Sequence, residues 1–167
     1  VCSRSAHGVS LLFKDIFGVG RAATSLTHAT GAPTWLARLL TDVKKVIVFI
    51  MRRAVIKALF LAMPDALALR QPQDQRMGGA FLVLQRFFQD RRHIKDLFHH
   101  PAVIEYVTHD QYGQKYHDEY ADLLEEMVDN NFAWKQVKKA IWMLEPLYML
   151  LRRCDVSTPN FTWVAMS

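Results

Sequence analysis

The sequence predicts an all-α fold, an irregular helical domain of seven to eight helices, and three observations support this prediction. Apolar residues recur at gaps of three and four over most of the 167 residues. No segment shows the alternating apolar and polar pattern of a half-buried strand, and no hairpin turn signal occurs. The chain has 7 Gly and 6 Pro, too few for a loop-rich or fibrous protein. With 51% apolar residues, a chain of this length holds one ordinary core.

Two helices are predicted before residue 64. The first spans residues 3–17, and Gly18 and Gly20 end it before a loop over 19–33. Its apolar face carries Val9, Leu12, Phe13, Ile16 and Phe17. Thr34 caps a second, long helix that Pro64 ends, because the residue before a proline disfavours helical angles. The apolar set of the long helix is Trp35, Leu36, Leu39, Leu40, Val43, Val46, Ile47, Ile50, Ala54, Ala58 and Leu61.

The middle of the chain predicts three shorter helices. After a polar connection over 64–75, a helix starts at Asp74 or Gln75 and carries the apolar residues Phe81, Leu84, Phe87 and Phe88. The run Asp90-Arg91-Arg92 breaks that pattern, and Ile94, Leu97 and Phe98 resume it. Pro101 fits the first turn of a short helix through Val107. Residues 108–114 are polar and predict a loop.

The last third predicts one helix over 116–128 and another over 132–153, separated by Asn130-Asn131. The first keeps Tyr116, Tyr120, Leu123, Leu124, Met127 and Val128 on one face, and the second keeps Phe132, Val137, Ile141, Leu144, Leu147, Tyr148 and Leu151. Pro146 lies inside the second pattern and is expected to kink the helix or to split it in two. A loop follows over 154–160.

Composition excludes several classes of protein. The two cysteines, Cys2 and Cys154, are too few for a disulfide scaffold and suit a reducing compartment. The longest apolar run, Val46 to Met63, is interrupted by Arg52, Arg53 and Lys57, so no membrane span is expected. The net charge of +5 points weakly toward polyanions. Both ends are expected to lie inside a longer protein, because the chain starts next to a helical pattern and stops in an apolar run.

Clusters of titratable residues give no specific metal or nucleophile signature. His99-His100, His109 and His117 form the densest histidine group, but they lack zinc-ligand spacing, so surface or loop histidines are favoured over a metal site. Cys2 and His7 have no third group to orient them as a nucleophile pair. The acidic run from Asp118 to Asp129 has helical spacing and lacks the glycine of a calcium loop, which favours a solvated helix face. No metal site and no catalytic residue are therefore predicted.

Basic residues come in adjacent pairs: Lys44-Lys45, Arg52-Arg53, Arg91-Arg92, Lys138-Lys139 and Arg152-Arg153. Lys45 and Arg52 are seven residues apart and share a helix face, with Lys44 beside them. A stripe of this kind can follow DNA phosphates. The DNA-binding prediction therefore names Lys44, Lys45, Arg52 and Arg53. A solvated face that keeps the domain soluble is the alternative, and composition alone favours it.

Three stretches of the chain, taken in order, form a distinctive series. The first runs from Ser5 to Ile16 and includes His7 and Asp15, and the second runs from Arg70 through Arg76-Met77 to Phe87. The third runs from Trp134 through Glu145-Pro146-Leu147 to Asp155 and Pro159. Each resembles a motif of the hAT-type transposases, which have a split RNase H-like core, and the third match is the most specific. Apart from a longer loop near 18–33, order and spacing agree over nearly the whole chain.

The resemblance implies a place inside a larger nuclear protein. Residues 1–17 would be the core helix that follows the strand bearing the second catalytic carboxylate, 18–33 a loop, and 34–167 the helical insertion, truncated at its C-terminus. The family's three carboxylates and the Mg²⁺ that they bind would lie outside this chain, so the fragment itself is expected to need no cofactor and to be inactive as an enzyme. DNA and, through a missing C-terminal region, a second copy are the partners that the resemblance implies. No membrane partner is expected.

Departures from the family pattern suggest a decayed or domesticated copy, or a mis-predicted piece of a gene. Arg4 stands where the family has Cys, and Ser10 stands where it has Asn. Met77 replaces the aromatic residue after the family's arginine, and a methionine cannot stack on a base as a ring does. Arg76 is expected to contact a phosphate, with a surface charge as the equally weighted alternative. The expected function is DNA contact or packing without catalysis. The alternative is a helical module that binds another protein.

Overall fold

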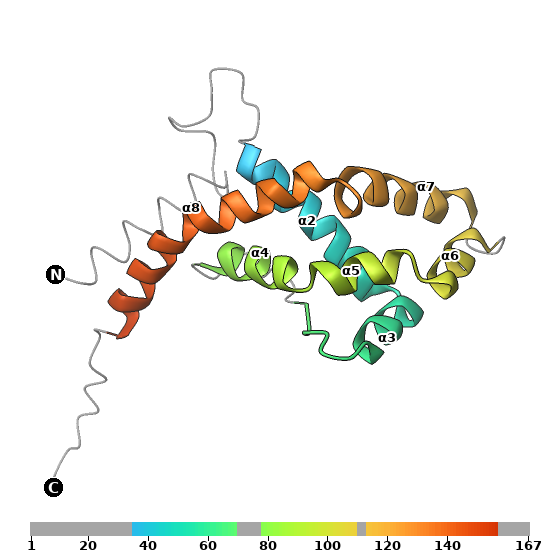
Figure 1. Cartoon of the computed structure of the whole chain (residues 1–167), viewed down its shortest axis with the longest axis horizontal. Coiled ribbons are helices and arrows are strands. Elements are labelled where there is room, and N and C mark those ends of the chain that lie inside the picture. The colour runs from blue at the N-terminus through green and yellow to red at the C-terminus, as the bar shows by residue number, and fades with distance from the viewer. Residues whose placement is uncertain (1–34, 70–77, 110–112, 157–167) are drawn as a thin grey trace, which may run out of the picture.

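The computed structural model describes residues 35–69, 78–109 and 113–156, and these residues confirm the all-α prediction (Figure 1). They contain seven α-helices, one π-helical segment and no strand. The elements are α2 (Trp35–Arg52), α3 (Ala54–Ala62), α4 (Gly79–Gln89), α5 (Arg91–Phe98), α6 (Pro101–Thr108), α7 (Gly113–Leu123), η2 (Leu124–Val128) and α8 (Asn131–Val156). The predicted helix over 3–17, the loop over 18–33 and the start of a helix near Asp74 lie outside the described residues.

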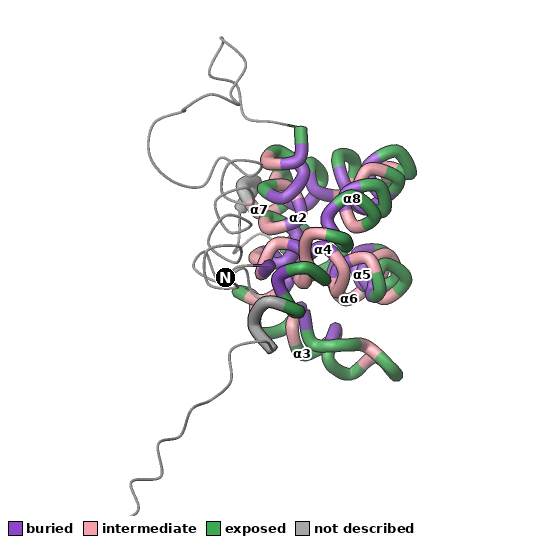
Figure 2. The backbone as a smooth tube through the Cα atoms, turned by 90° about the vertical axis from the view of Figure 1, so that its left-hand side faces the viewer, coloured by how far each residue is buried: buried purple, intermediate pink, exposed green. Residues whose placement is uncertain are grey.

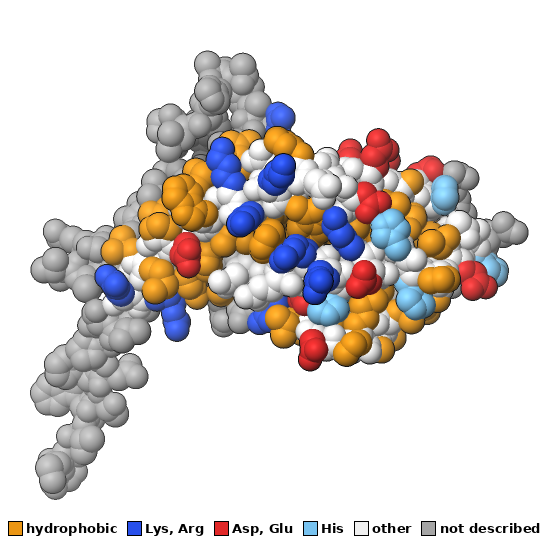
Figure 3. Space-filling model, viewed as in Figure 1, with side chains coloured by type: hydrophobic (Ala, Val, Ile, Leu, Met, Phe, Trp, Pro, Cys, Tyr) orange, Lys and Arg blue, Asp and Glu red, His pale blue; other side chains and the backbone are white. Residues whose placement is uncertain are grey.

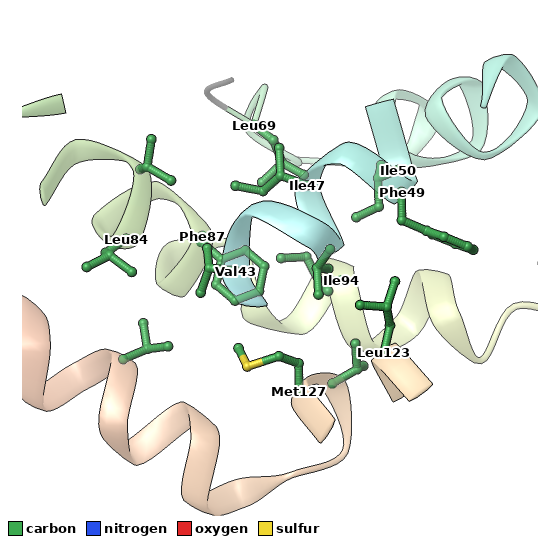
Figure 4. Packing of buried hydrophobic residues seen from close by; sticks show 14 of the residues in the cluster. Val43, Ile47, Phe49, Ile50, Leu69, Leu84, Phe87, Ile94, Leu123 and Met127 are labelled. Carbon is green, nitrogen blue, oxygen red and sulfur yellow. The ribbon is translucent and has the colours of Figure 1, made fainter. Parts of the chain in front are cut away.

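Helix α2 is the centre of the bundle and contacts α3, α4, α7, η2 and α8. In Figure 1 it crosses behind two longer rows of helices, one made of α4 and α5 and one made of α7 and α8. Figure 2 shows that the buried positions of these helices face the interior of the bundle. Val43 and Ile50 of α2 and Ile94 of α5 are fully buried, and Figure 4 shows them together with Met127 of η2.

Aromatic rings connect α2, α5 and α7 in this core. The Phe49 ring lies 5.4 Å from the Phe98 ring, and Phe98 stacks on Tyr120 at 5.5 Å between centroids. The Tyr120 hydroxyl donates a 2.6 Å hydrogen bond to the Phe98 carbonyl. That bond satisfies a polar atom in the apolar core, as burial of a phenol requires.

The long helix predicted from Thr34 to Pro64 is wrong in one respect, because the chain leaves helical geometry at Arg53. Its backbone is extended there, with φ −103° and ψ 110°, so α2 ends at Arg52 and α3 starts at Ala54. The break changes which residues reach the core. Ala54, Ala58 and Leu61 were expected on the buried face and are exposed, as is Trp35 at the start of α2.

Burial of larger side chains explains the break. A continuous helix would turn Ala54, Lys57, Ala58 and Leu61 toward the core below Ile47 and Ile50, since they continue the same three-four spacing. The break turns Ile56 and Phe60 inward instead, and both are fully buried. Each buried aliphatic or aromatic side chain of this size contributes about 1.5–3 kcal/mol, far more than an alanine. Helix α3 then ends at Ala62, within two residues of Pro64 as predicted.

A hydrogen bond joins the connection after α3 to the junction between α4 and α5. Pro64 is followed by Asp65 at φ 61°, and the Ala66 amide donates to the Met63 carbonyl, which closes a tight turn. Asp90 is the buried residue between α4 and α5, and its Oδ1 accepts a 3.1 Å bond from the Leu67 amide. The pattern break predicted at Asp90 is therefore a real helix boundary.

Helix α8 runs without interruption from Asn131 to Val156 and contains Pro146, so of the two predicted alternatives, a kink or a split, the split is wrong. A proline at this position removes the amide that would bond the Trp142 carbonyl four residues earlier. Both Pro146 and Trp142 are exposed, so water can reach the carbonyl that loses its partner. The exposed position lets the helix continue through the proline.

The helix predicted over 116–128 ends in a π-helical turn that the sequence pattern did not reveal. Over η2 the backbone closes a wider ring, with the Asp129 amide bonding the Leu124 carbonyl at 2.8 Å. The Val128 carbonyl at its end accepts a 2.9 Å bond from the indole Nε1 of Trp134. This bond links the end of η2 to the first turns of α8.

Candidate polyanion-binding site

The basic stripe predicted on α2 lies in an acidic environment. Lys45 forms a 2.8 Å ion pair with Asp42, and its side chain is 54% exposed. Its hydrogen bond to Asp42 raises the pKa of Lys45, partly opposed by desolvation, and the charges of Asp42, Glu126 and Asp122 raise it further. Neighbouring carboxylates that favour the lysine cation also repel phosphate. Lys44 is partly buried and makes a contact of its own.

The other two residues of the predicted stripe point to different surroundings. Arg52 is exposed at the end of α2. The Arg53 side chain is 11% exposed, and its Nη2 lies 2.6 Å from Glu119 Oε2 on α7. Its guanidinium also covers the Phe49 and Tyr116 rings, at 4.0 and 4.7 Å from their centroids. Arg53 is thus a structural residue that joins the α2–α3 break to α7, and it is not presented to a ligand.

The residues singled out by the resemblance are not brought together. His7, Asp15, Arg76 and Met77 lie outside the described residues. Trp134 is 6% exposed, stacks on Phe87 at 4.9 Å and bonds the Val128 carbonyl, so it is a packing residue. Glu145 and Pro146 are exposed on the outer side of α8, away from Trp134 along the helix.

A cleft between α5 and α8 gathers positive charge around a cavity. Its volume is about 420 Å³. The lining residues are Phe88 from α4, Arg91, Arg92 and Lys95 from α5, and Asn131, Trp134, Lys135 and Lys138 from α8. Figure 3 shows the blue side chains gathered over the neighbouring parts of these helices, with apolar surface between them. We call this the α5–α8 cleft.

The local sequence explains why the cleft has this shape. Asp90 ends α4 and directs the chain into α5, so the first turn of α5 carries Arg91 and Arg92. Asn130 starts α8, because its Oδ1 accepts bonds from the amides of Phe132 and Ala133 at 3.0 and 3.2 Å. The Trp134 side chain, held by its own hydrogen bond, supplies the apolar wall together with Phe88.

The cations of the cleft have little to neutralise them. No acidic side chain lines the cleft. Arg91 lies over the Phe88 ring at 4.8 Å and reaches the Phe88 carbonyl at 3.5 Å. Within residues 35–69, 78–109 and 113–156, no ion pair or hydrogen bond involves the side chains of Arg92, Lys95, Lys135 or Lys138. These four side chains remain available for an anion.

This charge arrangement does not serve the stability of the helices. Arg91 and Arg92 stand at the N-terminus of α5, where the helix dipole disfavours cations. Arg91 and Lys95 form a like-charge pair at a spacing of four, and Lys135 and Lys138 form one at three. Each such arrangement costs tenths of a kcal/mol. A cluster that opposes local stability and surrounds a cavity is typical of a binding site.

The sequence contains the pairs Arg91-Arg92 and Lys138-Lys139, but it does not predict that they line the same cleft, because about 45 residues separate them. Their meeting depends on how α5 and α8 pack, which no local pattern reveals. The spacing of Arg91 to Lys95 and of Lys135 to Lys138 was the available signal, since each set occupies one side of its helix.

The histidines and acids considered for metal binding have structural or surface roles. His99 Nε2 lies 2.9 Å from Asp129 Oδ1 on the surface, and His100 Nδ1 accepts a bond from the Ala102 amide at the start of α6. His93 lies against Asp90, with Nε2 3.0 Å from the Pro64 carbonyl. In the described ranges, no three His, Cys, Asp or Glu side chains come close enough to hold a metal ion.

Comparison with known proteins adds no relative: no family model, curated protein or solved structure matches the chain. Among the described helices, none is both long and apolar enough to cross a membrane.

Proposed function

We propose that this helical domain binds the phosphate backbone of DNA in the α5–α8 cleft, as the DNA-contacting helical insertion of a hAT transposase-like protein. The observation that carries the proposal is the set of four cations, Arg92, Lys95, Lys135 and Lys138, around a cavity with no acidic lining. Phosphate contacts of this kind position a protein on DNA without reading its sequence. Weak, sequence-independent and salt-sensitive binding is therefore expected.

The two rows of cations match the form of a nucleic acid backbone better than a single small anion. Arg92 and Lys95 lie on one helix, and Lys135 and Lys138 lie on another that faces it. Residues three apart on a helix are separated by about 4.5 Å along its axis. Along one DNA strand a phosphate recurs about every 3.4 Å of the helix axis, a comparable spacing, so two neighbouring phosphates can each meet one cation from either helix.

The setting of this binding comes from the resemblance to the hAT family. In that setting the chain would act in the nucleus, beside a catalytic core whose carboxylates and Mg²⁺ lie outside residues 1–167. The domain would hold DNA near that core, and its own residues would perform no phosphoryl transfer. Phosphoryl transfer of this class depends on a metal cluster held by carboxylates.

The test compares two variants that each lose four positive charges, one in the cleft and one on α2. The cleft variant combines Arg92→Gln, Lys95→Gln, Lys135→Gln and Lys138→Gln. The control variant combines Arg38→Gln, Lys44→Gln, Lys45→Gln and Arg52→Gln on α2. Glutamine keeps helix propensity, and all eight positions are exposed or partly exposed, so both proteins are expected to fold.

Fluorescence anisotropy with a labelled duplex of about 20 base pairs, two helical turns, measures the affinity at low salt. The cleft variant is expected to bind at least about tenfold more weakly than the native chain, since each lost phosphate contact weakens binding. The control variant is expected to lose much less. Absence of binding by the native chain at low salt, or equal losses in both variants, would overturn the proposal.

A second candidate function is a helical module that binds another protein, without nucleic acid. An extended apolar surface on α8 favours it. The same titration separates the two functions. A protein-binding module would attract DNA only through its overall net charge of +5, so the cleft variant and the control variant would lose the same affinity for DNA.

A further inference from the structure

The C-terminal half of α8 exposes large apolar side chains on the side that faces away from α4. Trp142 is 75% exposed, Met149 51%, Leu150 46% and Met143 44%. With the exposed Pro146 they form one surface, which we call the α8 stripe. Figure 3 shows this apolar surface along the part of α8 that extends beyond the body of the bundle.

The stripe has the spacing of a helix–helix contact. Pro146 follows Trp142 by four residues, and Met149 and Leu150 follow Pro146 by three and four. These gaps place the four residues on one side of α8 over about 12 Å. The opposite side of the same segment is already buried, since Leu144 and Leu151 are 1% and 3% exposed and Tyr148 stacks on Phe81. Between Ile141 and Leu151 the only charged residue is Glu145. A helical segment that is apolar on all sides is one that is buried on all sides.

Charges at the two ends of the stripe indicate what covers it. Lys135, Lys138 and Lys139 precede the stripe, and Arg152 and Arg153 follow it. A second copy that crosses antiparallel at Pro146 would bring Lys139 opposite Arg153, because each lies seven residues from the proline. A parallel second copy would set every charge opposite itself. Like charges opposite each other in an interface disfavour the pairing, whereas carboxylates there would complement both ends.

We propose that the α8 stripe is the docking site for an amphipathic helix of a partner protein, with an apolar face flanked at both ends by Asp and Glu. The partner's apolar side chains pack on Trp142 and Leu150 with spacings of three and four. Its terminal carboxylates meet Lys139 at one end of the stripe and the Arg152-Arg153 pair at the other. Recognition of this kind is the helix-in-groove mode, read through residues on one helical face. The site is separate from the α5–α8 cleft and does not depend on DNA binding.

The probe is a synthetic helical peptide of about 18 residues, five turns, with Leu on one face and Glu in its first and last turns. A matched peptide carries Lys in place of Glu, and a third has the acidic composition with the Leu residues scrambled. The full chain is tested beside a stripe variant with Trp142→Gln, Met149→Gln and Leu150→Gln. A control variant carries Val55→Gln, Leu61→Gln and Ile104→Gln, which are exposed apolar residues elsewhere.

Anisotropy of the labelled acidic peptide should report binding to the full chain and to the control variant, and binding about tenfold weaker or more to the stripe variant, as loss of central anchors predicts. The lysine and scrambled peptides should also bind at least about tenfold more weakly than the acidic peptide. The lysine peptide lacks the negative charge, and the scrambled peptide lacks the apolar face. Equal binding of the acidic and lysine peptides, or no binding of either, would overturn the proposal.

Two further outcomes would assign the stripe to another occupant and so contradict the proposal. Sedimentation of the native chain as a dimer, reversed in the stripe variant but not in the control variant, would identify a second copy. Peptide binding that appears only after Phe161→Ser and Trp163→Ser would show that residues 157–167 of the same chain compete for the stripe. Circular dichroism of every variant confirms that the helices are intact.

Discussion

Arg53 combines three interactions in one partly buried side chain. It pairs with Glu119, donates to the Phe49 carbonyl at 3.1 Å, and covers the rings of Phe49 and Tyr116. The ion pair itself contributes little, because the Glu119 side chain is 41% exposed and water screens it. Most of the stabilisation by Arg53 therefore comes from its packing and from its bond to the end of α2.

Two substitutions at this contact should consequently differ in their effect on stability. Arg53→Ala should lower the free energy of unfolding by about 2 kcal/mol, through lost ring contacts and a lost hydrogen bond. Glu119→Gln should lower it by less than about 1 kcal/mol. Urea denaturation followed by circular dichroism measures both values. A larger effect for Glu119→Gln would mean that the ion pair dominates.

The buried Tyr120 phenol should make the stability of the fold depend on pH in the alkaline range. Burial raises the pKa of its phenol above the ordinary value, and the charge of Asp129 adds to the shift. A group whose pKa is raised in the folded state stabilises the fold below its unfolded pKa and loses that contribution as pH rises through the folded pKa. The native chain should therefore lose stability above about pH 10, the ordinary tyrosine value.

The Tyr120→Phe variant isolates this effect. At pH 7 it should be less stable by about 1 kcal/mol or more, because the hydrogen bond to the Phe98 carbonyl is lost in the core. Above about pH 10 the difference between the two proteins should shrink, since phenylalanine does not titrate. Thermal melts at a series of pH values test this, and a difference that stays constant up to the alkaline limit would refute the assignment.

At the scale of elements, helix starts and stops determine where the cleft cations stand. Asn130 caps α8 and fixes the turn that carries Asn131 and Trp134. Asn130→Ala should lower the free energy of unfolding by about 1 kcal/mol, the usual effect of losing an N-cap. Asn130→Asp keeps the acceptor and should retain stability. Chemical denaturation of the three proteins gives the comparison, and an Asp variant as unstable as the Ala variant would show that the cap is not responsible.

Replacing Pro146 should have the opposite effect and increase stability. It is exposed in the middle of a helix, where a proline costs about 3 kcal/mol relative to alanine. Pro146→Ala restores an amide for the Trp142 carbonyl and should raise the free energy of unfolding by about 1–3 kcal/mol. A differential scanning calorimetry measurement that finds a lower melting temperature would indicate that α8 must bend at Pro146 to pack on α4.

Local sequence signals predicted the elements well wherever a proline, an Asp or an Asn marks a boundary, as at Pro64, Asp90, Pro101 and Asn130. They failed at Arg53, because an arginine carries no breaking signal and the choice between Ile56 and Ala54 as the buried residue depends on neighbouring helices. They also missed η2, whose wider turn is stabilised by a hydrogen bond from Trp134, a residue beyond the helix itself.

At the scale of the whole molecule, one row of acids and one cluster of cations stand on different helices. The acids Asp118, Glu119, Asp122, Glu125, Glu126 and Asp129 lie along α7 and η2 or directly after them, whereas the cations of the α5–α8 cleft come from α5 and α8. Sequence alone gave the basic pairs but favoured α2, because Lys44 to Arg53 are close along the chain. It could not show that α2 stands beside Asp122 and Glu126, or that α5 and α8 line one cleft.

The central claim, that the α5–α8 cleft holds DNA phosphates, is tested most directly by the salt dependence of binding. The slope of log Kobs against log salt changes by about 0.9 for each phosphate contact on duplex DNA. The variant with Gln at Arg92, Lys95, Lys135 and Lys138 should therefore have a slope shallower than that of the native chain by about 3.6, for four lost contacts. The variant with Gln at Arg38, Lys44, Lys45 and Arg52 should keep the native slope to within about 1. A native slope in the cleft variant, or the same reduction in both variants, would contradict the account.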